Sequence, residues 1–198
     1  MGMQDLAYLR PPPQLAAIQQ GTESLGFSLA SEPLVGALLR TLVASKPAGR
    51  FLELGTGTGV ATAWLLDGMD PASALTTVDT DPTVQQIARR HLGADPRLTF
   101  VTSGALEFLR SQPAPFDLVF ADALPGKYEG LESALATVKP GGFYVIDDLL
   151  PQSNWPEGHA ARVPVLIEQI AARPDFQILP IVWASGVIVA VRIRTSAD

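Results

Sequence analysis

The segment FLELGTGTGV, residues 51–60, is the part of the sequence whose residue types indicate chemistry most directly. An apolar run containing Glu53 leads into Gly55, Gly57 and Gly59, three glycines at alternate positions. Glycine lets the backbone turn sharply, and it lets a ligand lie against the main chain where a Cβ atom would collide. The segment therefore predicts a strand, a ligand-binding turn and the start of a helix.

The glycine spacing differs from two common nucleotide-binding motifs. A Gly-x-Gly-x-x-Gly dinucleotide fingerprint needs glycine where Val60 or Thr62 stands, and a phosphate loop needs a Gly-Lys-Ser/Thr ending that is missing here. The remaining E-x-G-x-G-x-G pattern resembles the first motif of class I S-adenosylmethionine-dependent methyltransferases. By that resemblance, Glu53 orients the glycine loop or meets the methionine amino group, and Thr56 also belongs to the cofactor-binding residues.

Carboxylates end four of the predicted strands, namely Glu53, Asp79, Asp122 and the pair Asp147 and Asp148. In an open parallel sheet, ligands bind beyond the carboxyl ends of the strands, so we expect these side chains to gather at one edge. Acids needed only for solubility would lie on exposed helix faces at a lower free-energy cost. The acidic strand ends therefore predict a binding site.

Asp79 follows Gly59 by 20 residues, the separation at which an acid accepts hydrogen bonds from a ribose diol in related nucleotide folds. The resemblance assigns Asp79, with its neighbour Thr80, to the adenosine ribose of the cofactor. The other role open to Asp79 is to cap the next helix. That role suits Asp81 better, because Pro82 follows it as a first-turn residue.

The segment SGALE, residues 103–107, follows the third predicted strand. It looks like the adenine-contacting segment of the same family, in which small residues let the purine edge meet backbone N–H groups. Gly104 and Ala105 are the small residues here. Asp122 completes the set of cofactor-binding residues that the resemblance implies.

The acids after the fourth and fifth strands resemble a more specific pattern. In the small cation-dependent O-methyltransferases related to catechol and caffeoyl-CoA O-methyltransferases, one Asp ends the fourth strand and an Asp-Asn pair ends the fifth. Asp122, Asp147 and Asp148 stand at the corresponding places, with Asp in place of Asn. The resemblance implies a Mg²⁺ ion that lowers the pKa of a hydroxyl group, and methyl transfer to an oxygen of a small-molecule acceptor.

The family's lysine three residues after the first Asp is Pro125 here. Lys127 or Tyr128 is expected in its place, unless Lys127 is a solvated loop residue. His159 ends a Pro-rich loop, residues 149–159, that is expected to overhang the carboxyl edge and border the acceptor pocket, so it is a second candidate base. Two alternatives stay open: a metal-independent methyltransferase that uses His159 or Lys127 as base, and a silent S-adenosylmethionine-binding module.

These residues must be positioned by an α/β sheet, because short apolar runs alternate with amphipathic ones from residue 50 onward. The sequence predicts strands at 51–54, 74–79, 97–101, 116–121 and 142–147, and helices at 58–68, 83–92, 104–111, 129–137 and 160–173. Strands at 176–183 and 187–193 are joined by three residues and must form an antiparallel hairpin. The pattern resembles the Rossmann-like seven-stranded methyltransferase fold, mostly parallel with one antiparallel strand and helices on both faces.

The 198 residues are expected to form one domain, 1–198, in which a helical lead at 1–49 precedes a cofactor-binding core at 50–198. Helices are expected at 14–20 and 33–44, the second capped by Ser31 with Pro33 in its first turn.

The composition limits the classes of molecule that the chain is expected to bind. The net charge of −6 without a clustered basic face argues against nucleic acid, and the absence of cysteine excludes disulfides and thiol chemistry. Without a visible signal peptide or an 18-residue apolar run, the chain is expected to be cytoplasmic and not to associate with membranes. The N-terminal helices and the apolar C-terminal hairpin are compatible with a homodimer.

Overall fold

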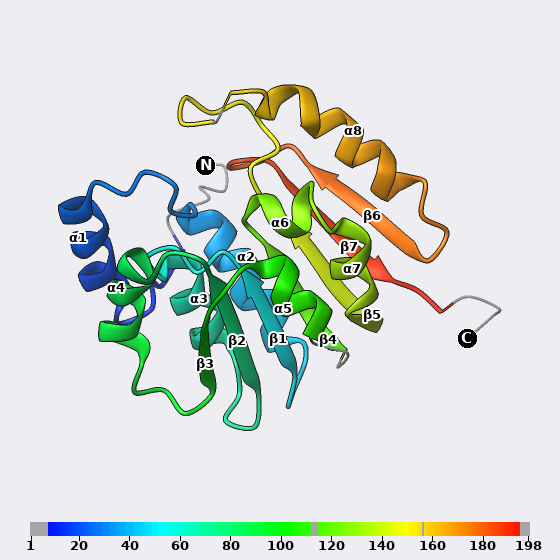
Figure 1. Cartoon of the computed structure of the whole chain (residues 1–198). Helices are drawn as coiled ribbons and strands as arrows, with labels where there is room; N and C mark the ends of the chain where they lie inside the picture. The colour runs from blue at the N-terminus through cyan, green and yellow to red at the C-terminus, as the bar shows by residue number, and fades with distance from the viewer. Residues whose placement is uncertain (1–7, 112–114, 156, 195–198) are drawn as a thin grey trace.

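The computed structural model describes residues 8–111, 115–155 and 157–194, which form a seven-stranded sheet with helices on both faces (Figure 1). The sheet order is β3-β2-β1-β4-β5-β7-β6, and β7 alone runs antiparallel to its neighbours. The predicted fold class is therefore confirmed. The strands are β1 (Arg50–Leu54), β2 (Ala74–Asp79), β3 (Leu98–Thr102), β4 (Phe116–Ala121), β5 (Val138–Ile146), β6 (Phe176–Ile181) and β7 (Val187–Arg192).

The helices form two layers with separate hydrophobic clusters. Side chains along β1 point alternately to the two faces of the sheet. Phe51 therefore packs in one cluster, and Leu52 and Leu54 pack in the other. The first layer contains α1 (Leu15–Leu25), α2 (Pro33–Ala44), α3 (Val60–Gly68) and α4 (Pro82–Leu92), and the second contains α5 (Ala105–Ser111), α7 (Leu131–Ala136) and α8 (His159–Ala171). The short element α6 (Leu124–Lys127) follows β4.

Element boundaries differ from the sequence-based expectations in a few places. Helix α1 continues to Leu25, and β5 starts at Val138 rather than at residue 142. The helix expected at 129–137 begins at Leu131, because Gly130 has a φ of 67° and breaks the chain direction just before it. The two strands of the C-terminal hairpin are antiparallel, as predicted.

The predicted helix cap at Ser31 is wrong. The residue at the N-cap of α2 is Glu32, which makes no side-chain cap hydrogen bond. Ser31 Oγ instead donates to Asp122 Oδ2 at 2.8 Å. A hydrogen bond to a carboxylate is stronger than one between neutral groups. Ser31 therefore donates to the distant Asp122 carboxylate rather than capping α2.

The N-terminal helices are built into the core rather than preceding it. Ile18, Val35 and Leu39 are fully buried in the same cluster as Phe51 and Trp64. Helix α2 approaches α3 so closely that a Cβ atom at Gly36 would lie 2.2 Å from the Trp64 ring. Helices α1 and α2 therefore contribute to the same hydrophobic core as β1 and α3.

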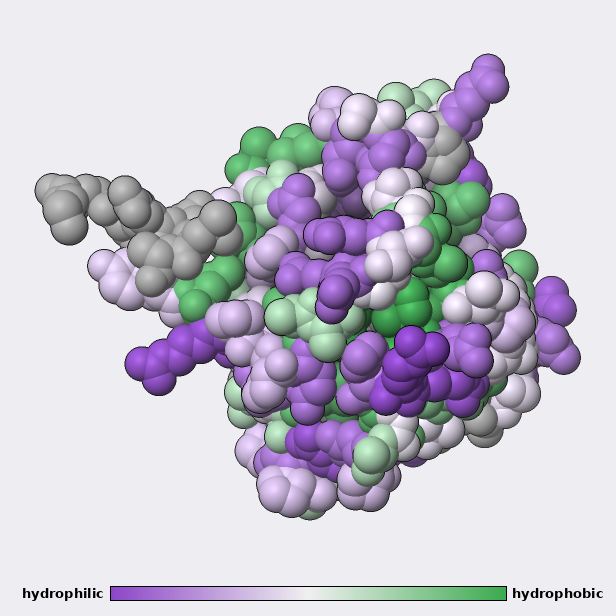
Figure 2. Space-filling view, turned by 90° about the vertical axis from the view of Figure 1, so that its left-hand side faces the viewer, coloured by the Kyte–Doolittle hydropathy of each residue, from purple (hydrophilic) through white to green (hydrophobic). Residues whose placement is uncertain are grey.

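The side of the molecule formed by α1 and α4 is mostly hydrophilic, with apolar atoms in smaller patches between the polar ones (Figure 2). Helix α4 contributes Arg89, Arg90 and His91 in its last turn. No helix in the described ranges is long and apolar enough to cross a membrane.

The contact between α2 and α3 yields a test of the packing. Gly36→Ala should lower the free energy of unfolding by about 1–3 kcal/mol, because the new methyl group collides with the buried Trp64 ring. Helix propensity alone predicts the opposite sign, a gain of about 1 kcal/mol. Urea unfolding decides between them. Gly21→Ala in α1 is the milder comparison, since its new Cβ atom would lie 3.0 Å from Ile87 Cγ2, compared with 2.2 Å from the Trp64 ring for Gly36→Ala.

Candidate functional site

The site lies where the strand order reverses. The chain passes from β1 to β2 on one side and returns to β4 on the other, so the ends of β1 and β4 border a crevice. A pocket of about 310 Å³ opens there. It is lined by the glycine loop, by the acidic ends of β2, β4 and β5, and by residues of the loops that follow α1 and β5.

Each glycine of the loop has a positive φ, which confirms the predicted turn: 104° at Gly55, 51° at Gly57 and 92° at Gly59. Their surroundings differ. A Cβ atom at Gly59 would lie 2.6 Å from Cβ of Ala88, so this glycine allows α3 to pack on α4. Gly55 and Gly57 line the pocket together with Thr56, and Gly59 does not line it.

Asp79 connects the glycine loop to the end of β2. Its Oδ2 accepts the Gly57 N–H at 2.8 Å, and its Oδ1 accepts the Asp81 N–H at 3.0 Å. Asp81 caps α4, as expected, by accepting from the first-turn amides. Asp79 lines the pocket, so its remaining acceptor capacity is available to a ligand.

The expected adenine segment lies beside Asp79, since Ser103 N–H donates to the Asp79 carbonyl at 3.0 Å. A Cβ atom at Gly104 would meet no protein atom within 4 Å, so there is open space at this position. Thr80, Gly104 and Ala105 are not among the residues lining the pocket. They lie at the same sheet edge as Asp79 but outside the pocket itself.

Glu53 is fully buried beneath the glycine loop and does not line the pocket. Its Oε2 accepts from Thr62 at 2.6 Å and from Thr77 at 2.5 Å, and Thr77 in turn contacts Thr56 at 2.6 Å between hydroxyl oxygens. Burial raises the pKa of Glu53 to about 8, although the hydrogen bonds from Thr62 and Thr77 act to lower it. This geometry agrees with the first of the two expected roles, orienting the glycine loop.

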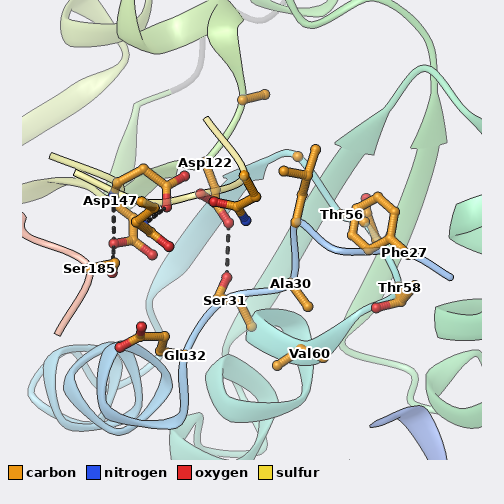
Figure 3. Close-up of a pocket in the computed structure, with 18 of the residues that line it drawn as sticks. Phe27, Ala30, Ser31, Glu32, Thr56, Thr58, Val60, Asp122, Asp147 and Ser185 are labelled. Carbon is orange, nitrogen blue, oxygen red and sulfur yellow. Dashed lines mark hydrogen bonds between the residues drawn. The ribbon is translucent and has the colours of Figure 1, made fainter. Parts of the chain in front are cut away.

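Three carboxylates meet at the ends of β4 and β5. Asp122, Asp147 and Asp148 each place one oxygen within 4.8 Å of the others. Figure 3 shows two of them held by serines from distant segments, Ser31 on Asp122 and Ser185 on Asp147. The three acids therefore converge, as the sequence predicts. Asp122 and Asp148 are also ion-paired with Lys127, which counts against a cation held between the acids.

Asp148 completes the cluster from a left-handed backbone conformation, with a φ of 63°. Its N–H donates to Asp147 Oδ1 at 2.7 Å, and Gln152 Nε2 donates to its Oδ1 at 2.7 Å. Such conformations are uncommon outside glycine and occur often at functional sites.

Lys127 supplies the positive charge of the cluster and is only 2% exposed. Its Nζ lies 3.2 Å from Asp148 Oδ2 and 3.5 Å from Asp122 Oδ1. The preceding Pro125 and Gly126 have the dihedral angles of a tight turn, which brings Lys127 into the pocket. The alternative of a solvated loop lysine is therefore wrong.

Burial and mutual repulsion act on the protonation of this cluster. Burial raises the pKa of Asp122 well above its usual value although Lys127 opposes the shift, and burial followed by repulsion from Asp148 raises the pKa of Asp147 to about 6. Burial also disfavours the Lys127 ammonium, but Asp122, Asp148 and Asp147 outweigh it, so the pKa of Lys127 is raised. The lysine is held as a cation.

The loop after β5 borders the pocket, as predicted, through Gln152, Asn154, Trp155 and His159. His159 is 5% exposed, and its Nε2 lies 3.0 Å from the Tyr128 hydroxyl and 3.2 Å from the Asp148 carbonyl oxygen. The Trp155 and His159 ring centroids are 4.4 Å apart. His159 therefore fastens the loop to the core. Pro156, one of the prolines expected to keep the loop ordered, lies outside the described residues.

Several lining residues were not expected from the sequence. The segment between α1 and α2 passes over the glycine loop and contributes Phe27, Leu29 and Glu32 to the pocket, and Ser185 reaches it from the turn between β6 and β7. Figure 3 shows Phe27 beside Thr56 and Thr58. Apolar residues in an otherwise polar connection, such as Phe27 and Leu29, were the only sequence signal for this contribution.

Comparisons with known proteins agree with this architecture. Residues 52–149 match a family model described as a methyltransferase domain. A provisionally named O-methyltransferase of Mycolicibacterium smegmatis is 30% identical over 189 residues, covering 90% of each chain. Another from Mycolicibacterium vanbaalenii is 35% identical over 138 residues, and the matched region spans 67% of this chain but only 61% of that relative.

Among solved structures, the O-methyltransferase TomG of Streptomyces achromogenes, which is involved in tomaymycin synthesis and was solved with S-adenosylmethionine, superposes with a TM-score of 0.82. It is 25% identical, and the superposition covers 95% of this chain and 93% of TomG. Sequence identity over nearly the full length, the sheet order and the glycine loop lead to the same conclusion. The chain belongs to the family of S-adenosylmethionine-dependent O-methyltransferases.

Proposed function

We propose that this protein transfers the methyl group of S-adenosylmethionine to a hydroxyl oxygen of a small-molecule acceptor. The observation that carries the proposal is that one pocket holds both a nucleotide-type loop and a cluster of charged groups suited to a hydroxyl acceptor. The sulfonium of the cofactor is already activated, so the protein must chiefly align the acceptor oxygen and favour its deprotonated form.

The cofactor half consists of the glycine loop, Asp79 and the segment around Gly104. Asp79 receives the ribose hydroxyls, and Thr56 and Gly57 face the cofactor from the loop. The open space beside Gly104, next to Asp79 at the same sheet edge, suits the adenine. Glu53 supports this half from below through Thr77 and Thr56.

The acid cluster fits a divalent cation such as Mg²⁺. Three carboxylate oxygens within 4.8 Å of one another are the donor set that hard cations take, and a single ammonium leaves the three acids with excess negative charge. Asp122, Asp147 and Asp148 would hold the ion. When bound, it would lower the pKa of an acceptor hydroxyl and fix its direction.

Lys127 is the stronger catalytic candidate, because the acids hold it as an ammonium whose charge would stabilise the developing oxyanion of the acceptor. It could accept the acceptor proton only after losing one of its own. Its Nζ lies inside the acid cluster, where the acceptor oxygen is expected. His159 Nε2 is already in contact with the Tyr128 hydroxyl and the Asp148 carbonyl. We therefore assign His159 to positioning Asp148 and the loop, and keep it as base only in the metal-independent alternative.

Two other functions remain in competition. In the metal-independent enzyme, Lys127 offsets the acids and no cation is needed, an arrangement that its two ion pairs permit. In the silent binding module, the cofactor binds without turnover. Methyl transfer to a panel of hydroxylated aromatic compounds, measured with and without a chelator, separates the three. Chelation should abolish transfer if the cation is required.

The proposal further includes a small-molecule acceptor, no nucleic-acid partner, a cytoplasmic location and a possible homodimer.

Replacing Asp79 with alanine tests the cofactor half. A hydrogen bond to a charged group contributes about 1.5–3 kcal/mol, so Asp79→Ala should weaken S-adenosylmethionine binding by about ten- to a hundredfold. Isothermal titration calorimetry measures the change. The matched control is Asp81→Ala, which removes the cap of α4 and should lower stability by about 1 kcal/mol with little effect on cofactor affinity. If Asp79→Ala and Asp81→Ala changed cofactor affinity equally, Asp79 would not be the residue that binds the ribose.

The pH dependence of Mg²⁺ binding tests the acid cluster. Protons compete with the cation for Asp147, whose pKa is about 6, so Mg²⁺ affinity should be high above that pH and fall as the pH drops through it. Asp147→Asn should weaken binding and flatten this dependence. Calorimetric titrations with Mg²⁺ at about pH 5 and about pH 7.5 show the effect. An affinity that is independent of pH, or no binding at all, would support the metal-independent alternative.

Substitution of Lys127 and His159 tests these assignments. Lys127→Met keeps the length of the buried chain but removes its charge, and should reduce kcat by about 10²- to 10³-fold. His159→Gln should reduce kcat less, because it alters positioning only. Initial rates with the best acceptor from the panel provide the measurement, and cofactor affinity serves as the folding control for both variants. A larger loss for His159→Gln would reverse the assignment.

A further inference from the structure

Gln85 is a fully buried polar side chain on α4 that does not line the pocket. Its amide makes four hydrogen bonds. Nε2 donates to Thr56 Oγ1 at 3.1 Å and to the Val101 carbonyl oxygen at 3.2 Å. Oε1 accepts from Arg89 Nη2 at 2.8 Å and from Thr102 Oγ1 at 2.7 Å. An amide offers two N–H donors and two acceptor lone pairs, so the hydrogen-bonding capacity of this one is completely used.

These partners fix the direction in which the amide points. A guanidinium can only donate and a main-chain carbonyl can only accept, so Oε1 must face Arg89 and Nε2 must face Val101. The Thr56 hydroxyl oxygen therefore accepts a hydrogen from Gln85. Its own proton must be directed to another acceptor.

That acceptor belongs to the buried network beneath the glycine loop. The hydroxyl oxygens of Thr56 and Thr77 are 2.6 Å apart, and Thr77 donates to Glu53 Oε2 at 2.5 Å. Because Gln85 can only donate to Thr56, the chain of hydrogen bonds runs in one direction, from the amide through two threonine hydroxyls to the Glu53 carboxyl. Reversing it would leave the Gln85 amide and the Thr56 hydroxyl presenting hydrogens to each other. The network therefore holds the Thr56 side chain in one orientation.

The position of Thr56 affects the residues that face the cofactor. The Gly55 and Thr56 N–H groups donate to the Val78 carbonyl at 2.9 and 3.3 Å, and the next N–H, that of Gly57, donates to Asp79 Oδ2 at 2.8 Å. A displacement of Thr56 would move Gly57 with it. The orientation of the Asp79 carboxylate therefore depends on the anchoring of Thr56.

Gln85 also holds the other side of Asp79. Thr102 lies opposite Asp79 in the register of β2 and β3, and the following Ser103 N–H donates to the Asp79 carbonyl at 3.0 Å. Through Val101 and Thr102 the Gln85 amide binds this end of β3, and through Thr56 it binds the glycine loop. One side chain thus connects the two segments on either side of Asp79.

We propose that Gln85 is a positioning residue for S-adenosylmethionine, and that it keeps the glycine loop and the end of β3 at the separation that the adenosine part of the cofactor requires. It acts through Thr56 and Thr102 rather than by touching the cofactor. The inference rests on the cofactor half of the proposed function and depends neither on the acceptor nor on a cation.

Replacing Gln85 with methionine tests the inference, because methionine has a similar volume but no N–H group to donate. The dissociation constant of S-adenosylhomocysteine, measured by isothermal titration calorimetry, should rise about five- to tenfold. The neighbouring Gln86 is exposed and gives the matched control, so Gln86→Met should leave this constant unchanged. Gln85→Glu should also weaken binding, because an ionised carboxylate accepts from Arg89 and Thr102 but cannot donate to Thr56.

Kinetics distinguish positioning from a role in stability alone. In Gln85→Met the KM for S-adenosylmethionine should rise, whereas kcat at saturating cofactor and the KM for the acceptor should stay near the values of the natural protein. A lower melting temperature with an unchanged cofactor dissociation constant would overturn the inference. If Gln85→Met is too unstable to titrate, the isosteric Gln85→Glu gives the decision by the same measurements.

A double-mutant cycle tests the route through Thr56. Thr56→Val keeps the shape of the side chain and removes the hydroxyl that Gln85 binds. Because both changes break the same hydrogen bond, the double variant should lose less affinity for S-adenosylhomocysteine than the product of the two single losses. Losses that multiply fully would overturn the inference.

Two outcomes separate the inference from the proposed function. Binding of S-adenosylhomocysteine that depends on Gln85, without methyl transfer to any acceptor, would support the inference and count against the proposed function. Methyl transfer with a cofactor affinity that neither Gln85 variant changes would overturn the inference and leave the proposed function in place.

Discussion

The site depends on one buried ammonium placed among three carboxylates. Burying charged groups is costly, and removing one partner of a buried pair costs several kcal/mol because the other charge is left without compensation. Lys127 pairs with Asp122 and Asp148 at the edge where β4 and β5 end. The three carboxylates can lie within 4.8 Å of one another because this lysine offsets part of their repulsion.

The local structure around Lys127 is specialised for this placement. The chain turns at Gly126, whose φ is 95°, and Tyr144 donates to the Gly126 carbonyl at 2.6 Å. A Cβ atom at Gly126 would lie 2.7 Å from the Leu54 side chain, so a larger residue would push the turn away from β1. The departure from the family pattern at Pro125 is therefore compensated by a turn that carries the lysine back into the site.

Loops from distant parts of the chain border the pocket beside the charged cluster of Lys127 and the three acids. Ser31 binds Asp122, Ser185 binds Asp147, and Asn154 Nδ2 donates to the Ser28 carbonyl at 2.8 Å. The segment after α1 and the loop after β5 are thereby joined above the pocket. The shape of the pocket and the fold of the N-terminal helices are consequently coupled, so changes far from the glycine loop are expected to alter the pocket.

The sequence by itself determined the sheet, the glycine turn and the acids at the strand ends. These features follow local rules: alternation along strands, positive φ at glycine, and the convergence of parallel strand ends at one edge. Tertiary structure alone decided that Lys127 is buried, that Ser31 serves Asp122 rather than α2, and that Glu32 faces the pocket. Ser31 and Asp122 are 91 positions apart, as Ser185 and Asp147 are 38 apart. Contacts of that kind depend on how whole elements pack, and no local residue pattern encodes them.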